Sequence, residues 1–178
     1  MQRLIEKMSR AMLVIAVAAA ALAFVSCKNK KKESADNQEK VRIEKVADFR
    51  SHGLTSYELD VVVANDSRVT FKLESASVDV YIGSMRLGSI KADVEITVPK
   101  RSTTTVTLPL SASIDNPLGL ISAYNKISRG DTGDVHFTLH ARIKAAGAAR
   151  TIERQNITLA EVLSLAGVDP SSLKNIKF

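Results

Sequence analysis

A strict alternation of apolar and polar residues constrains the fold of this chain more than any other feature of the sequence. It is clearest in residues 90–98, 106–110 and 135–143, and it recurs at 59–63 and 78–82. Successive side chains of a β-strand point to opposite faces, so a period of two places all the apolar residues on one face. Strands with one buried and one wet face are typical of antiparallel sheets.

Turn signals separate these stretches. Gly83-Ser84 lies between two apolar runs with the glycine first, which favours a two-residue hairpin of type II′. Gly147 separates a strand expected at 135–145 from another expected at 148–159. About seven short strands between residues 41 and 159 predict an antiparallel β-sandwich. A chain of this size can bury a sufficient core without disulfide bonds.

Two helices are expected to interrupt the strands. Asn116 can cap a helix whose first residue is Pro117, and Gly130 would end it. Near the C-terminus, Thr158 and Glu161 have the spacing of a capping box and predict a second, short helix. The predicted fold class is therefore all-β, with one helix between strands and a short C-terminal helix.

The N-terminus has the pattern of a secretory signal: a basic segment precedes an uncharged stretch from Ala11 to Val25. That stretch has about 15 residues, whereas a membrane-spanning helix needs about 20. The order Phe24-Val25-Ser26-Cys27 resembles the lipobox of bacterial lipoproteins. The resemblance implies a signal peptide at 1–26, cleaved before a Cys27 that carries acyl chains such as palmitate. The alternatives are an uncleaved anchor and an ordinary signal peptide with a chance cysteine.

Residues 28–40 are expected to form a disordered basic tether, because they contain no aliphatic residue larger than alanine. Four lysines in 28–32 would lie close to anionic lipid head groups, although a solubilising linker explains them equally well. Lys28 stands where lipoproteins retained in the inner membrane carry aspartate. We therefore expect the protein to be anchored through Cys27 in the outer membrane and to face the periplasm, with residues 41–178 as the folded domain.

The charge balance argues against a nucleic-acid-binding protein. The chain has 25 basic and 19 acidic residues, and removing 1–26 leaves 22 and 18, with most of the surplus in the tether. The sequence contains no basic helix, and aromatic residues make up only 4% of it. We expect a monomer whose partner, besides the membrane, is an unknown protein or lipid.

No motif predicts catalysis, a cofactor or a metal. The sequence contains no Gly-x-Ser-x-Gly elbow, and an acylated Cys27 could not act as a nucleophile. His136 and His140 would lie about 13 Å apart on a strand, too far to share a metal. Residues 130–134 offer two aspartates, fewer ligands than the roughly six to eight oxygens of a calcium site. We therefore expect a protein that is not an enzyme and has no cofactor.

The order of strands, turns and helices resembles the group 2 late-embryogenesis-abundant fold, also called the water-stress and hypersensitive-response domain. The matching stretches are LDVVVAND at 59–66, VYIGSMRLG at 80–88, the passage 98–110 and the passage 120–139. Ala64-Asn65-Asp66 stands where the family commonly has Asn-Pro-Asn. The resemblance covers residues 41–159 and implies an immunoglobulin-like or fibronectin-like sandwich with a helix across one end. It also implies no enzyme activity, and protection of proteins or membranes under stress.

Apolar residues gather where the expected hairpin and the expected first helix begin: Ile82, Met85, Leu87, Leu118 and Leu120. They could line a groove for an acyl chain, although ordinary core positions explain them as well. Three functions follow as hypotheses. The protein could bind or shield a protein or membrane partner in the cell envelope, handle lipid in such a groove, or serve as a structural subunit of an envelope complex.

Overall fold

The computed structural model describes residues 41–53, 55–92, 94–129, 131 and 133–165. The strands and helices in these residues are β1 (Val41–Ser51), β2 (Ser56–Asn65), β3 (Phe71–Ile82), β4 (Met85–Ala92), β5 (Ile96–Val98), β6 (Ser102–Ile114), α2 (Pro117–Ser128), β7 (Val135–Ala145), β8 (Ala148–Thr158) and α3 (Leu159–Leu165). The predicted all-β fold with one helix between strands and a short C-terminal helix is confirmed. The strands number eight in the described residues, where about seven were expected. The signal peptide, Cys27 and the tether lie outside the described residues.

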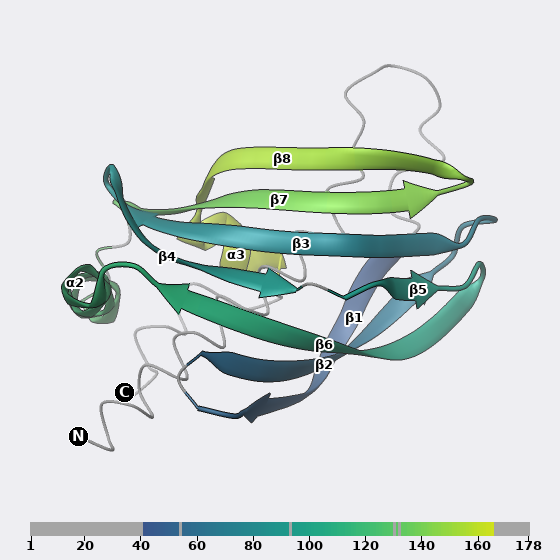
Figure 1. Cartoon of the computed structure of the whole chain (residues 1–178), viewed down its shortest axis with the longest axis horizontal. Coiled ribbons are helices and arrows are strands. Elements are labelled where there is room, and N and C mark those ends of the chain that lie inside the picture. The colour runs from purple at the N-terminus through teal and green to yellow at the C-terminus, as the bar shows by residue number, and fades with distance from the viewer. Residues whose placement is uncertain (1–40, 54, 93, 130, 132, 166–178) are drawn as a thin grey trace.

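The strands form one continuous antiparallel sheet that folds over on itself. Its order is β1-β2-β6-β4-β3-β7-β8, with β5 also paired to β3. Strand β6 pairs with β2 over ten positions but meets β4 only at its last four residues, 111–114. The strands β1, β2 and β6 therefore form one layer and β3, β7 and β8 the other, and β4 and β5 close one side between them (Figure 1).

The alternation seen in the sequence fills a single core between the two layers. In β7, Val135, Phe137 and Leu139 are at most 2% exposed, while the residues between them are half-buried. In β2, Leu59 and Val61 are fully buried, and they belong to the same apolar cluster as the β7 residues. The strand β1 contributes only partly buried side chains to this cluster. Burial of apolar surface from both layers is the main stabilising contribution to such a fold.

The alternating run at 90–98 is not one strand, as its pattern suggested. Ala92 at the end of β4 faces Ala76, and Ile96 at the start of β5 faces Leu73. The register with β3 therefore shifts by one residue between β4 and β5, and the run pairs with β3 as two separate strands.

The predicted turns and caps are largely confirmed. Gly83 has φ +56°, as the first position of a type II′ turn requires. The side chain of Asn116 caps α2, whose first residue is Pro117. At the C-terminal helix, the backbone N–H of Thr158 donates to the Glu161 carboxylate at 2.8 Å, and the N–H of Glu161 donates to the Thr158 hydroxyl at 3.2 Å.

The capping box also corrects one boundary. Because it turns the chain into a helix at Leu159, that residue begins α3, although the strand was expected to run to 159. At the other helix, α2 ends at Ser128, and the predicted stop Gly130 lies outside the described residues.

Candidate functional site

The start of α2 is hydrogen-bonded to β4 and packs against it. The backbone N–H groups of Asp115 and Asn116 both donate to the Leu87 carbonyl, at 2.9 and 3.1 Å. The Asn116 side-chain oxygen accepts the N–H of Gly119 at 2.7 Å. A Cβ atom at Gly119 would lie 2.7 Å from Leu87 Cδ2, so the glycine allows the helix to approach the strand closely. The helix and the β3–β4 hairpin therefore share one end of the sandwich (Figure 1).

Large apolar side chains are exposed at this end. Leu118 is 80% exposed, Met85 48% and Ile121 38%. Leu118 and Ile121 are three residues apart and so are neighbours on the helix surface. Met85 joins them at the helix start, where its sulfur lies 2.9 Å from the Asn116 side-chain nitrogen. We call Met85, Leu118 and Ile121 the apolar end.

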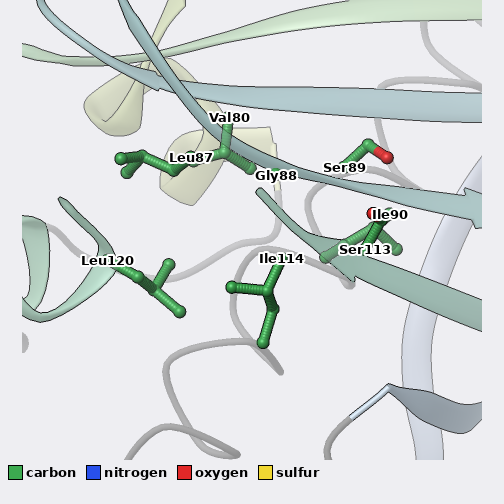
Figure 2. Close-up of a pocket in the computed structure, with 8 residues that line it drawn as sticks. All are labelled: Val80, Leu87, Gly88, Ser89, Ile90, Ser113, Ile114 and Leu120. Carbon is green, nitrogen blue, oxygen red and sulfur yellow. The ribbon is translucent and has the colours of Figure 1, made fainter. Parts of the chain in front are cut away.

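A small cavity lies beneath the apolar end. It is lined by Val80, Leu87, Gly88, Ser89, Ile90, Ser113, Ile114 and Leu120 (Figure 2). The lining is almost entirely apolar and comes from β3, β4, β6 and α2. Its volume of about 10 Å³ has room for about one water molecule, which is far less than an acyl chain needs.

The five residues suggested for an apolar groove fall into different surroundings. Leu87 and Leu120 line the small cavity. Ile82 is half-buried and packs against the core. Met85 and Leu118 are exposed to solvent. The structure thus brings two of the five residues to one cavity and presents two others on the surface above it.

Two cations near the apolar end, Arg86 and Lys126, are paired with acids. Arg86 donates to Asp79 at 2.8 Å and also to Asp115. The hydrogen bond to Asp79 raises the pKa of Arg86 above its usual range. The ion pair between Lys126 and Asp134 raises the pKa of the lysine and lowers that of the aspartate. This end of the molecule is therefore close to charge balance, and its exposed apolar side chains are the feature that distinguishes it.

The histidines occupy separate places on the outer surface. His136 stacks on Tyr81 with the ring centroids 5.3 Å apart. The ring of His140 lies 3.8 Å from the carboxylate of Asp79 and 3.9 Å from that of Glu153 on β8. Within the part of the chain that the structure describes, no three His, Cys, Asp or Glu residues come together as a metal site would require.

The family comparison assigns this fold. The model of the late embryogenesis abundant protein family matches residues 60–155, which is more than half of the chain. The chain belongs to this family. The resemblance inferred from the strand order is thereby confirmed, and membership indicates a stress-related, non-catalytic role.

Two solved structures are similar to this late embryogenesis abundant protein. One is the crystal structure of a protein from Archaeoglobus fulgidus, with 13% identity, a TM-score of 0.38, and coverage of 64% of this chain and 97% of that one. The other is the X-ray structure of Northeast Structural Genomics Consortium target SoR45, with 11% identity, a TM-score of 0.34, and coverage of 68% and 86%. A search of curated proteins finds no match. No helix in the described residues is long and apolar enough to cross a membrane.

The asparagine at the family's Asn-Pro-Asn position has a structural role that the sequence analysis missed. Asn65 is fully buried, and its side-chain nitrogen lies 3.0–3.1 Å from the carbonyls of Val69, Val98 and Pro99. Its side-chain oxygen accepts the N–H and the hydroxyl of Ser67. Asn65 therefore ties the end of β2 to the end of β5. Its place in the family motif was the sequence signal that could have singled it out.

Proposed function

We propose that this late embryogenesis abundant protein is a lipid-anchored, non-catalytic envelope protein that shields stress-sensitive partners through its apolar end. Acylated Cys27 would hold it on the periplasmic face of the outer membrane. The proposal rests on the solvent exposure of Leu118, Met85 and Ile121. Exposed apolar side chains that gather in one place mark surfaces that contact proteins or membranes.

The partner surface is argued from where the apolar side chains lie and how they are held. The helix start is fixed by the Asn116 cap and by two backbone hydrogen bonds to Leu87, so Leu118 projects from a rigid support. A preformed surface loses less conformational entropy on binding than a flexible one. Membership of a stress-related family favours shielding over a purely structural role.

Lipid handling is the weaker alternative. The small cavity beside Leu87 and Leu120 is far too small for an acyl chain in this conformation. Native mass spectrometry of the protein, purified gently from its own envelope, separates the two functions. Stoichiometric acyl lipid bound in addition to the anchor would support lipid handling, and a protein without such lipid would support shielding.

The direct test of shielding is a drying experiment. A drying-sensitive enzyme is dried and rehydrated with the wild-type protein or with the double variant Leu118→Ser/Ile121→Ser. We expect the wild type to preserve most of the enzyme's activity and the double variant to lose most of this protection. Both side chains are exposed, so the double variant should remain folded.

A matched control is available at the other end of the molecule. Val69 is also 38% exposed, so Val69→Ser removes an exposed apolar side chain without touching the apolar end. This variant should protect as well as the wild type. Equal protection by the double variant and the wild type would contradict the proposed role of the apolar end.

A further inference from the structure

Two loops meet at the end of the sandwich opposite α2. The β2–β3 connection and the β5–β6 connection are joined by a hydrogen bond from the Arg101 N–H to the Ser67 carbonyl, at 3.1 Å. Asn65 ties the same two connections together through the carbonyls of Val98 and Pro99. Figure 1 shows this end on the right, away from α2. The two loops therefore form one surface held from within by a buried side chain.

That surface carries three positive charges. Arg68, Lys100 and Arg101 are exposed, and within the described residues none of them makes a side-chain hydrogen bond or an ion pair. The only acid in the two loops is Asp66, which is paired with Arg42. We call Arg68, Lys100 and Arg101 the basic end. Within the part of the chain that the structure describes, no side chain neutralises their charge, which leaves it available to an external anion.

The tether joins the folded domain at this same end. Val41 is the first residue of β1 and lies opposite Asn65. Residues 28–40 therefore lead from the proposed anchor at Cys27 directly to the basic end. A flexible chain of that length spans about 20 Å, so an acylated Cys27 would keep the basic end close to the membrane surface.

We propose that the basic end docks on the anionic head groups of the membrane and holds the domain upright, with its apolar end pointing away. This inference rests on the proposed anchoring through Cys27. Each basic residue near an anionic surface favours binding by about fivefold, so three together favour docking by roughly a hundredfold. Val69 follows Arg68 in the same loop and is 38% exposed, and it adds an apolar side chain suited to the head-group region.

Fluorescence energy transfer between the protein and lipid vesicles tests the orientation of the domain. The mature chain carries Thr70→Cys at the basic end or Ser122→Cys on α2, and a fluorophore is attached to the new thiol. Acylated Cys27 cannot react, and both labelled positions are exposed. The acceptor sits on lipid head groups of phosphatidylcholine vesicles, made with or without phosphatidylglycerol. We expect stronger transfer from position 70 than from position 122 in the anionic vesicles, and a smaller difference in neutral vesicles or at about 1 M salt, where the Debye length is about 3 Å.

A charge variant and a matched control identify the residues responsible. The variant Arg68→Gln/Lys100→Gln/Arg101→Asn should lower the ratio of docked to undocked protein by roughly a hundredfold. Asparagine is chosen at 101 because the backbone there has φ +50°, a conformation that asparagine tolerates. The control Lys45→Gln/Lys91→Gln/Arg129→Gln removes three other exposed cations with no side-chain partner in the described residues and should leave docking unchanged.

The outcomes separate docking from anchoring. The mass of the mature chain shows whether Cys27 is acylated. If it is acylated and the two labels give equal transfer, or if the charge variant docks like the wild type, the docking proposal is overturned while the anchor stands. If Cys27 is not acylated, the anchor is overturned. Co-sedimentation of the processed chain and its charge variant with phosphatidylglycerol vesicles then decides whether the basic end binds the membrane by itself.

Discussion

The two ends of this sandwich differ in what they expose. The end where β1 begins exposes one valine and three cations without side-chain partners in the described residues. At the end that carries α2, the ion pairs of Arg86 and Lys126 balance the charge, and large apolar side chains reach solvent. A domain with one charged end and one apolar end can be oriented by a charged surface and still present its apolar end to a partner.

Different interactions also stabilise the two ends. The basic end is held by Asn65, a fully buried side chain that joins two loops. The apolar end is held by Asn116, a half-buried helix cap, together with the packing of Leu87 against Gly119. Loss of a buried polar network leaves several groups unsatisfied, whereas loss of a cap near the surface leaves groups that water can reach. Asn65 should therefore contribute more than Asn116 to the free energy of unfolding.

The largest effect is expected from Asn65→Ala. The substitution leaves the carbonyls of Val98, Pro99 and Val69 without their side-chain donor, and it should lower the free energy of unfolding by about 4 kcal/mol. The matched variant Asn116→Ala removes a cap and should cost only about 1 kcal/mol. Urea denaturation of the two variants measures the difference. If both variants lost the same free energy of unfolding, the proposed difference between the two ends would be contradicted.

A smaller but still large effect is expected at Leu87. This side chain is 1% exposed and lines the small cavity, so Leu87→Ala should enlarge the cavity and lower the free energy of unfolding by about 3 kcal/mol. Leu118→Ala changes the same residue type at a site that is 80% exposed, and stability should change by less than about 0.5 kcal/mol. Thermal unfolding of both proteins gives the comparison. A large loss from Leu118→Ala would mean that this residue belongs to the packed structure rather than to a free surface.

The sequence predicted β2 and β7 from their apolar–polar alternation. The patterns at 59–63 and 135–143 correspond to β2 and β7, where every second residue is buried. The edge strand β1 was not singled out, because its pairing with β2 shifts between Ile43 and Lys45 and again between Val46 and Asp48. Each irregularity changes the spacing of its apolar residues from two to three. A strand with two bulges therefore lacks the periodicity by which strands are recognised.

The candidate sites were harder to predict, because they depend on contacts between distant segments. The sequence grouped Met85 with Leu118, and in the structure Met85 lies against the side chain of Asn116, two residues before Leu118. It could not tell that Leu118 is exposed and Leu87 buried, because both are leucines beside a turn. The basic end was also missed. Arg68 and Lys100 are 32 positions apart in sequence, and only the folded sheet brings their loops together.

The smallest predicted effect concerns the charge balance at the apolar end. The ion pair with Lys126 lowers the pKa of Asp134, so Lys126→Gln should raise that pKa toward the ordinary aspartate value of about 3.9. A carboxylate with a lowered pKa stabilises the folded state above the unfolded pKa, and this contribution disappears as the pH falls through the folded value. The variant should therefore be less stable than the wild type at neutral pH, and this difference in stability should disappear at acidic pH. An NMR titration of the Asp134 carboxyl carbon measures the shift. Lys100→Gln, which removes a cation from the basic end, should leave the Asp134 titration unchanged; a shift there as well would mean that the two ends are electrostatically coupled.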